Sequence, residues 1–306
     1  MKISQVIYLI KWFLGAKFFG KKKPLQSVIF VSDKCNLRCK HCSVYNNEPI
    51  TKSFEQLKEE MQYCYSLGSR FIDFEGGETT LWQDKDKDIN SLIECAKQMG
   101  FYSCTITTNA QKDFENSKAD SIWVSLDGVG EVHEKVRGVG TFERLEKNIQ
   151  NSHYMNVSVN MAINTLNAED VENVIEYVRK SPYIKSISLN FHTPFPKTEY
   201  LTIDKERKIE ILKKIISYKQ KNYPIMNSMA GLKTMLRFYE GKISAKKFAS
   251  CCWVTNFVFT DGTKLPQCAG KEYDACKECG FGMGSEMLSL FSFSPSTILA
   301  GMKLRL

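Results

Sequence analysis

Short apolar runs alternate with amphipathic segments along most of the chain, and this alternation predicts strands and helices in turn. The predicted strands are Ser27–Val31, Arg70–Phe74, Tyr102–Thr107, Ile122–Leu126, Val157–Ile163 and Ser186–Phe191. The predicted helical segments are 53–68, Ile89–Met99, Phe142–Gln150, Ala168–Arg179 and Lys205–Lys219. Six strands joined by right-handed crossovers form a parallel (β/α)6 unit. Periodicity alone leaves a partial TIM-type barrel and a doubly wound sheet open.

Two helix starts are marked by capping residues. Ser53 and Gln56 form a capping box, and Gly68 ends the helix that follows. Asn167 is the predicted N-cap of the segment that begins at Ala168. These signals place the loops between the predicted elements.

The first 24 residues differ from the rest, because apolar side chains surround most of a predicted helix. Lys11 and Lys17 interrupt the apolar run, and a bilayer-spanning helix needs roughly 20 apolar residues in a row. Lys11 also argues against a signal peptide. Two interpretations stay open: an interfacial membrane helix anchored by Trp12 and the following lysines, and a helix that caps the bottom of the domain.

Beyond Tyr223 the alternation of strands and helices is lost, and five of the eleven cysteines lie in residues 224–306. A stretch of this kind has a thin core, so we expect a small module that needs a bound group for stability. The predicted organisation is an apolar and basic helix in 1–24, a core domain in 25–223 and a cysteine-rich module in 224–306.

Charge and cysteine content narrow the class of protein. The net charge of +8 is dispersed apart from Lys21–Lys23, and no aromatic and basic stripe accompanies it, so we expect no nucleic-acid partner. An odd number of cysteines in tight clusters is typical of metal or iron–sulfur ligation rather than of a disulfide framework. Such cysteine usage predicts a reducing compartment, the cytoplasm.

One cysteine cluster follows the first predicted strand directly, as Cys35, Cys39 and Cys42 in a C-x3-C-x2-C array. Three thiolates can hold three irons of a [4Fe–4S] cubane and leave the fourth iron open to an outside ligand. A structural zinc site normally takes four ligands, and no further Cys or His follows at zinc spacing. Iron–sulfur ligation is therefore the favoured interpretation.

This array, with His41 just before its last cysteine, resembles the signature of the radical S-adenosylmethionine (radical SAM) superfamily. The resemblance covers residues 25–200 well and implies an α/β fold, a partial (β/α)6 TIM-type barrel with a small C-terminal cysteine-rich module. It implies that SAM binds the open iron and that one electron from the cluster cleaves it to methionine and a 5′-deoxyadenosyl radical. A reducing flavodoxin or ferredoxin is the implied electron donor.

Further motifs of the family fall at the carboxyl ends of successive predicted strands, where barrel active sites form. Gly76, Gly77 and Glu78 resemble the G-G-E motif, whose backbone and glutamate bind the ammonium group of SAM. Thr79 stands where the family usually has proline. Without its position one strand after the cluster loop, the same tripeptide would more often be a simple turn.

Five more side chains are expected to bind SAM by the same resemblance. Ser125 and Asp127 resemble the S-x-D element, and Asn109 resembles the T-N-G element with alanine in place of the glycine. Arg137, in an R-G pair placed in a loop before a helix, would clamp a carboxylate. Asn164 is expected at the edge of the adenine pocket. A turn or capping role is the alternative for each of them.

The second cysteine cluster resembles the start of the SPASM and twitch modules that follow many radical SAM domains. The expected ligands of an auxiliary [4Fe–4S] cluster are Cys252, Cys268, Cys276 and Cys279, with Cys251 as the alternative to Cys252. One residue more than usual precedes Cys268, and the later cysteines of a full SPASM module are missing. A zinc site with four thiolates is the alternative, because zinc and iron–sulfur sites share cysteine spacings.

The sequence leaves two classes of substrate open. His192, after the sixth strand, is a candidate general acid or base, and a hydrogen bond within its loop is the alternative. Peptides or small molecules compete with isoprenoid lipids, which the apolar N-terminus favours through a loose resemblance to adenosylhopane synthases. A peripheral contact with the inner face of the membrane through residues 1–24 belongs to the second idea. A two-cluster electron-transfer protein without SAM chemistry is the alternative to an enzyme.

Overall fold

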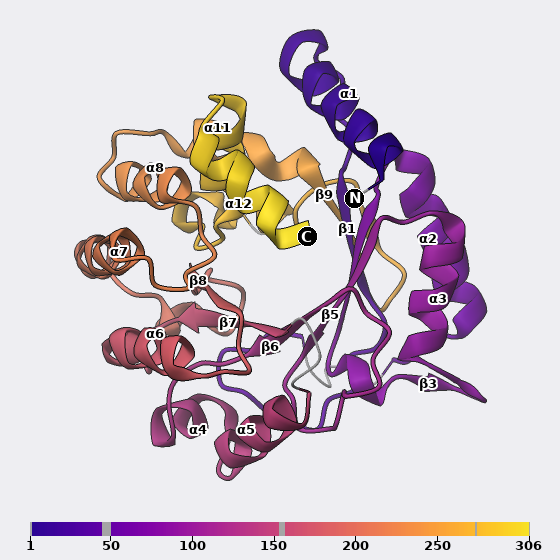
Figure 1. Cartoon of the computed structure of the whole chain (residues 1–306), viewed down its shortest axis with the longest axis horizontal. Helices are drawn as coiled ribbons and strands as arrows, with labels where there is room; N and C mark the ends of the chain where they lie inside the picture. Colours follow the sequence, from indigo (N-terminus) through magenta and orange to yellow (C-terminus); the bar gives the residue numbers. More distant parts are fainter. Residues whose placement is uncertain (1, 45–49, 153–156, 273, 306) are drawn as a thin grey trace.

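The computed structural model describes residues 2–44, 50–152, 157–272 and 274–305. Its centre is a curved, unclosed sheet with the strand order β10-β9-β1-β2-β5-β6-β7-β8 (Figure 1). The core strands are β1 (Gln26–Phe30), β2 (Phe71–Glu75), β5 (Ser103–Thr108), β6 (Ser121–Ser125), β7 (Val157–Ile163) and β8 (Ser186–Phe191). All six pair in parallel. The predicted open α/β barrel is confirmed, with each of these strands within one residue of its predicted bounds.

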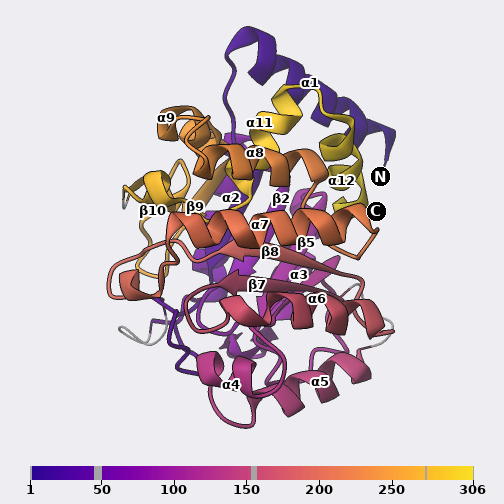
Figure 2. The ribbon, with the colours of Figure 1, turned by 90° about the vertical axis from the view of Figure 1, so that its left-hand side faces the viewer.

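Helices cover the outer face of this sheet (Figures 1 and 2). They are α2 (Phe54–Leu67), α3 (Ile89–Met99), α4 (Glu131–Arg137), α5 (Thr141–Asn151), α6 (Val171–Lys180) and α7 (Lys205–Gln220), with 3-10 turns at Thr79–Leu81, Ala168–Asp170 and Glu199–Leu201. A small hairpin of β3 (Gln83–Asp84) and β4 (Lys87–Asp88) precedes α3. The capping box at Ser53 is present, and Gly68 ends α2 in a left-handed conformation.

Two local predictions are wrong. The α-helix after β7 begins at Val171, and Asn167 makes no capping hydrogen bond with its side chain. Its side chain accepts a hydrogen bond from the Asn164 N–H instead (2.7 Å). Arg137 is the last residue of α4 and not part of a loop, because residues 131–137 complete two helical turns between two glycines.

Alternate residues of each core strand face the two sides of the sheet. Ile72, Ile106 and Val124 belong to the buried apolar core beneath the outer helices. The opposite face carries polar side chains that bond across strands, such as Thr105 with Ser121 (2.9 Å). Further cross-strand bonds on this face join Ser158 with Ser186 (3.0 Å) and Asn160 with Asn190 (2.9 Å). The inner face of the barrel is therefore rich in hydrogen-bonding groups.

Residues 224–305 cross from the β8 edge of the sheet to the β1 edge (Figure 1). The elements are α8 (Met229–Tyr239), α9 (Ala245–Phe248), the 3-10 turn Ala249–Val254, β9 (Thr255–Val258), β10 (Lys264–Leu265), α10 (Ala269–Glu272), the 3-10 turn Ala275–Glu278, α11 (Met283–Phe291) and α12 (Pro295–Arg305). β9 pairs in parallel with β1, and β10 pairs antiparallel with β9. Neither strand is predicted from the sequence.

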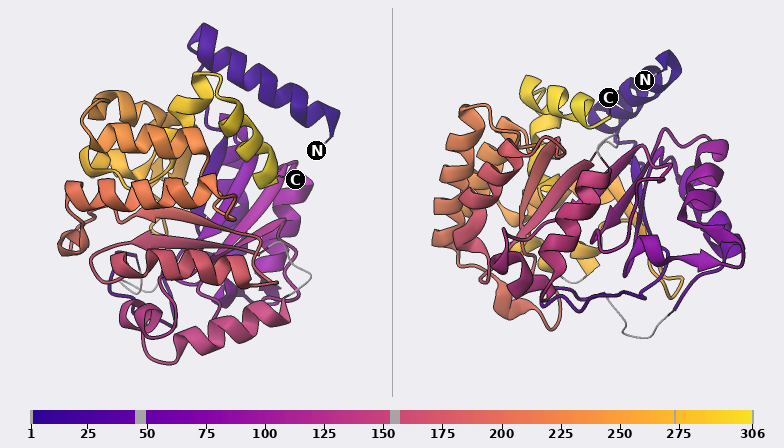
Figure 3. Two further views of the ribbon diagram at one scale, coloured as in Figure 1. Left: turned by 60° about the vertical axis from the view of Figure 1, so that its left-hand side comes forward. Right: turned by 60° about the horizontal axis from the view of Figure 1, so that its bottom comes forward.

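The first helix, α1 (Ile3–Phe19), lies across the amino ends of several strands (Figure 3). The Tyr8 hydroxyl donates to the carbonyl of Gly68, just before β2. The Trp12 ring lies 5.5 Å from the ring of Trp253, just before β9, and its indole N–H donates to the Lys23 carbonyl (2.8 Å). None of the helices in the described ranges is long and apolar enough to cross a bilayer.

Candidate active site

The three cysteines of the first cluster open onto one cavity at the carboxyl ends of the strands. This cavity measures about 160 Å³, and Cys35, Cys39 and Cys42 line it together with Ser125 and Arg137. Burial raises the pKa of the Cys35 thiol and raises that of Cys39 to about 11, although the Arg137 charge opposes the second shift. The thiols of Cys35 and Cys39 therefore favour their protonated form unless a cation or cluster compensates the thiolate charge.

Several N–H groups are directed at these sulfur atoms. The donor pairs are Leu37 N to Cys35 Sγ (3.4 Å), Asn109 Nδ2 to Cys35 Sγ (3.8 Å), Arg137 Nη1 to Cys39 Sγ (3.8 Å) and Val44 N to Cys42 Sγ (3.5 Å). Such hydrogen bonds to sulfur tune the potential of iron–sulfur clusters. In the part of the chain that the structure describes, no three His, Cys, Asp or Glu side chains are placed to hold a single metal ion.

Gly76 and Gly77 bring the end of β2 against the segment that leads into the cysteine loop. Gly77 N–H donates to the Ser32 carbonyl (2.6 Å), and Glu78 N–H donates to the Lys34 carbonyl (2.9 Å). A Cβ on Gly76 would collide with the Ser32 carbonyl, and the φ of +146° at Gly76 also favours glycine. The two glycines therefore fix the cysteine loop over the cavity that they line.

The Glu78 carboxylate joins the ends of β2 and β5 beneath the cavity. Its Oε1 accepts hydrogen bonds from the hydroxyls of Thr80 and Thr108, both at 2.6 Å. Its Oε2 accepts one hydrogen bond, from the backbone N–H of Asn109 (2.7 Å). The side chain is 2% exposed, so most of its hydrogen-bonding capacity serves the fold.

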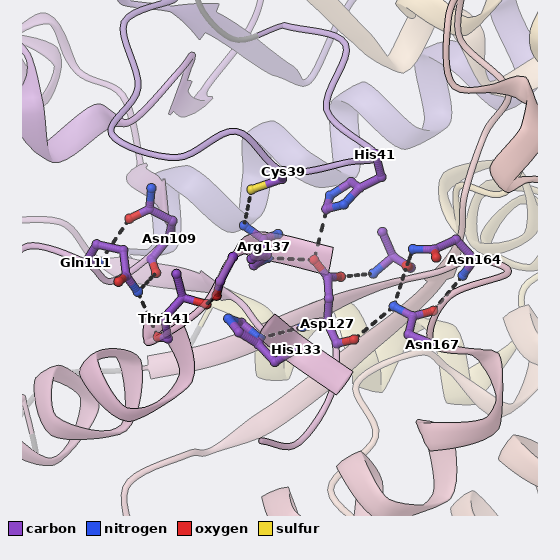
Figure 4. A network of polar contacts seen from close by, with 12 residues as sticks. Cys39, His41, Asn109, Gln111, Asp127, His133, Arg137, Thr141, Asn164 and Asn167 are labelled. Carbon is purple, nitrogen blue, oxygen red and sulfur yellow. Dashed lines mark hydrogen bonds and ion pairs between the residues drawn. The ribbon is translucent and has the colours of Figure 1, made fainter. Parts of the chain in front are cut away.

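Asp127 is the centre of a buried polar network (Figure 4). Its Oδ2 accepts from Arg137 Nε (2.6 Å) and lies 3.7 Å from His41 Nε2, while its Oδ1 accepts from the Ala162 N–H (3.0 Å). Burial opposes ionisation, but the Arg137 charge, together with His41, His133 and the hydrogen bond from the Ala162 N–H, holds the pKa of Asp127 below its usual range. The network places the Arg137 guanidinium against the Cys39 sulfur.

The other predicted site residues fall into two groups. Ser125 and Asn109 line the cavity, and Asn109 also donates to Asn36 Oδ1 (2.8 Å). Asn164 and His192 are not among the residues that line it. Asn164 donates to the Ala162 carbonyl (2.9 Å) in its own loop, and His192 Nε2 lies 3.0 Å from the Thr198 carbonyl. Burial lowers the pKa of His192, which is 6% exposed.

Two ionisable residues near the cavity, the half-buried Glu75 and the buried His133, are absent from the predicted set. Glu75, the last residue of β2, lines the cavity, and burial together with the charge of Asp73 raises its pKa to about 7. His133 is fully buried, its Nδ1 accepts from the Asp127 N–H (3.2 Å), and burial lowers its pKa to about 3. Strand alternation from Asp73 places Glu75 on the inner face, whereas no sequence pattern marks His133.

The five C-terminal cysteines gather beside the end of β8. Burial raises the pKa of Cys279 to about 12, and the charges of Cys268 and Cys276 add to this effect. The pKa of the Cys251 thiol is raised in the same way, by burial and by the charges of the other four thiols. A buried lysine, Lys208, is 1% exposed and lowers the pKa of Cys279. A cation at this position compensates negative charge on bound thiolates.

Comparison with known protein families identifies a domain that fits this fold and its cysteine loop. The model of the radical SAM superfamily matches residues 29–178. These residues form a radical SAM domain, and they contain the cysteine loop, the glycine pair, Ser125 and the Asp127 network. Such a domain implies a [4Fe–4S] cluster and SAM as its cofactors.

Three similar proteins extend this result. The chain is 28% identical over 177 residues to Fe-coproporphyrin III synthase of Methanosarcina barkeri, covering 53% of this chain and 43% of that protein. It is 24% identical over 287 residues to GTP 3′,8-cyclase of Clostridium botulinum, covering 85% and 86%. Streptococcus suis SuiB, solved with S-adenosylmethionine, has a TM-score of 0.63 at 18% identity, covering 81% and 61%.

The same SuiB has also been solved with its precursor peptide SuiA, with a TM-score of 0.64 at 16% identity, covering 92% of this chain and 69% of that one. The chain spans less than half the length of the coproporphyrin synthase and about three fifths of the SAM-bound SuiB chain. The three proteins differ in what their names and titles describe, so what the solved structures share with this chain is the fold.

Proposed function

We propose that the protein cleaves SAM reductively and uses the resulting radical on a C–H or C=C bond of an organic substrate. The observation that carries this proposal is that Cys35, Cys39 and Cys42 open onto the same cavity as the 76–78 segment and Ser125. When bound, a [4Fe–4S] cluster on these thiols supplies the electron that breaks a carbon–sulfur bond of SAM, giving methionine and a 5′-deoxyadenosyl radical.

The residues of the chain bind and orient SAM in this proposal. Glu78 Oε2 accepts one hydrogen bond from the protein and keeps a lone pair, which we assign to the ammonium group of SAM. The Ser125 hydroxyl lines the cavity and is assigned to the carboxylate or ribose of SAM. Asp127 is satisfied by three protein partners, so its part is to position Arg137, which also lines the cavity.

A second [4Fe–4S] cluster on Cys252, Cys268, Cys276 and Cys279, with Cys251 as the alternative to Cys252, is part of the proposal. Two observations support this cluster: the thiols raise one another's pKa values, and the buried Lys208 supplies a positive charge beside Cys279. A zinc ion on four of these thiols is the alternative, because zinc and iron–sulfur sites share cysteine ligands. A flavodoxin or ferredoxin in the cytoplasm would supply the electrons.

For the substrate, the inner face of the barrel favours a polar molecule. Its cross-strand bonds, such as that of Asn160 with Asn190 (2.9 Å), show that polar side chains line this face, whereas an isoprenoid chain packs best against apolar side chains. The acidic Glu75 at the cavity has the same effect. A peptide or a polar small molecule therefore suits this face better, with His192 as the candidate acid or base.

The test compares a Cys39→Ala variant with a matched Cys95→Ala control, since Cys95 lies on α3 outside both cysteine groups. Each protein is reconstituted anaerobically, reduced with dithionite and given SAM. We expect 5′-deoxyadenosine formation to fall at least about 100-fold in Cys39→Ala and to stay near the wild-type rate in Cys95→Ala. About half of the iron and labile sulfide should remain in Cys39→Ala, on the auxiliary cluster.

Two other outcomes separate the alternatives. Loaded wild-type protein that forms no 5′-deoxyadenosine is an electron-transfer protein, and the proposed function is then wrong. If metal analysis of Cys39→Ala finds zinc but no labile sulfide, the auxiliary cluster is contradicted. The proposal that the N-terminal cluster cleaves SAM does not depend on that result.

A further inference from the structure

The exposed side of α1 is mostly apolar, with Lys17 as the charged residue within it. The exposed fractions are 81% for Ile3, 39% for Val6, 46% for Ile7, 52% for Ile10, 41% for Leu14 and 60% for Phe18. At 100° per residue these side chains fall within about 120° of the helix circumference. The opposite side carries the residues that dock on the barrel, such as the buried Trp12. The exposed stripe therefore takes no part in packing α1 against the domain.

The C-terminal part of the chain extends this stripe. Phe293, between α11 and α12, is 53% exposed, and its ring contacts those of Phe13 (5.4 Å) and Phe18 (6.5 Å). Ile298 and Leu299 on α12 are 42% and 57% exposed. The ends of α1 and α12 lie near each other in every view (Figures 1, 2 and 3). We call the exposed apolar side chains of α1 together with Phe293, Ile298 and Leu299 the terminal apolar surface.

The charged residues of the N-terminal segment, which carries most of the terminal apolar surface, all have one sign. Residues 2–24 contain six lysines and no acidic residue. The lysines, all exposed, are Lys2, Lys11, Lys17, Lys21, Lys22 and Lys23. An apolar helical face bordered by lysines, with an aromatic residue at its edge, fits the boundary between the headgroups and acyl chains of an anionic bilayer. A protein partner would need a matching acidic rim around an apolar groove, whereas anionic lipid supplies both features.

The terminal apolar surface lies at the opposite end of the barrel from the cysteine cavity. The partners of α1 on the barrel include Gly68, Tyr102 and Trp253, which lie just before β2, β5 and β9. The cysteine loop and the 76–78 segment instead follow the carboxyl ends of β1 and β2. A surface bound to α1 therefore leaves the mouth of the cavity facing the solvent.

We propose that the terminal apolar surface binds peripherally to an anionic lipid bilayer, with α1 lying in the plane of the interface. The contact tethers the protein and does not deliver lipid to the cavity. It is independent of SAM cleavage, because no residue of α1 lines the cysteine cavity.

Vesicle sedimentation with the full chain, loaded anaerobically, tests the proposal. The probes are vesicles of phosphatidylcholine alone and vesicles of phosphatidylcholine with phosphatidylglycerol. We expect the wild type to sediment with the anionic vesicles and less so as salt is raised. The triple variant Ile3→Ser, Ile7→Ser, Ile10→Ser should bind at least about 10-fold more weakly. Lys21→Gln, Lys22→Gln and Lys23→Gln together should weaken binding on the order of 100-fold, about 5-fold for each lysine.

The matched control replaces two exposed apolar residues elsewhere, Val139→Ser and Tyr183→Ser, and should bind as the wild type does. All substitutions are at exposed positions, so circular dichroism and 5′-deoxyadenosine formation should be unchanged. Wild type that stays in the supernatant with anionic vesicles overturns the proposal. Equal binding of the isoleucine variant, or equal binding to neutral vesicles, also overturns it. A wild-type dimer in sedimentation velocity that the isoleucine variant dissociates assigns the surface to a second copy instead.

Discussion

Asp127 and Arg137 act on the cysteine loop as a pair. Asp127 is fully buried and holds Arg137 Nε at 2.6 Å, which leaves Arg137 Nη1 at 3.8 Å from Cys39 Sγ. A positive charge and an N–H···S bond next to an iron–sulfur cluster stabilise its reduced, more negative state. Arg137 is thus expected to raise the reduction potential of a cluster bound to Cys39.

Replacing Arg137 with glutamine removes this charge while keeping a hydrogen-bonding side chain. We expect the reduction potential to fall by on the order of 60–120 mV, since 59 mV is a tenfold change for a one-electron couple. An EPR-monitored redox titration of the loaded protein measures the shift. Arg144→Gln, an exposed arginine on α5, is the matched control and should leave the potential unchanged. Equal potentials for both variants would show that the Arg137 contact is only structural.

Glu75 makes stability depend on pH. Burial and Asp73 raise its pKa from 4.5 to about 7 in the folded protein, so the fold binds this proton more tightly than the unfolded chain does. Stability contributed by the protonated form is therefore lost as pH rises from 4.5 to about 7. Glu75→Gln should remove this loss, which amounts to roughly 3 kcal/mol.

Anaerobic thermal unfolding of the loaded protein between pH 5 and pH 8 checks the effect of Glu75→Gln. Glu115→Gln, at an exposed position, serves as the control and should keep the wild-type pH profile. Parallel profiles for wild type and Glu75→Gln would contradict the raised pKa of the Glu75 carboxyl.

The sequence motifs predict which residues line the cavity, but they do not predict the hydrogen bonds that these residues make. Ser125, Asn109 and the 76–78 segment line the cavity as the motifs predict. The hydrogen bonds of Glu78 to β5 and of Asp127 to Arg137 and Ala162 depend on contacts between strands and helices that no short motif encodes. His133 and Lys208 are absent from the predicted set for the same reason.

The end of β2 illustrates how an element positions a loop. A Cβ at Gly77 would collide with the backbone of Lys34, just before Cys35. Gly77→Ala should therefore displace the cysteine loop, lower the unfolding free energy by about 2 kcal/mol and reduce iron loading of the N-terminal site.

Gly15→Ala is the matched control for Gly77→Ala, because a Cβ at Gly15 meets only the Lys21 side chain at 3.6 Å. Alanine at this helical position should stabilise the protein by up to about 1 kcal/mol. Iron analysis and thermal unfolding measure both variants. Full iron loading of Gly77→Ala would contradict the proposed coupling between the glycine pair and the cysteine loop.

Hydrophobic periodicity is informative where an element has a regular buried face. The six core strands and the helix Ile89–Met99 follow from it. β9 does not, since it has only four residues and its place is set by pairing with β1, more than two hundred residues earlier in the chain. Helix α4 is missed because its seven residues give no clear periodicity between Gly130 and Gly138.

At the scale of the molecule, the chain separates three regions by folding back across its own sheet. The cysteine loop and the 76–78 segment meet at the carboxyl ends of the strands. The C-terminal cysteines reach the β8 side, where Gly280 N–H donates to Thr193 Oγ1 (3.0 Å). Helix α1 closes the amino ends. Composition and motifs predict that these three regions exist, but their positions in space depend on packing between distant parts of the chain.

The most direct test of the central claim is an EPR spectrum of the reduced, loaded Cys252→Ala, Cys268→Ala, Cys276→Ala, Cys279→Ala variant, recorded with and without SAM. Only the cluster on Cys35, Cys39 and Cys42 should remain in this protein. We expect a [4Fe–4S] signal that changes when SAM is added, because SAM binds the iron without a protein thiolate. A signal that SAM leaves unchanged would contradict SAM binding at an open iron of this cluster.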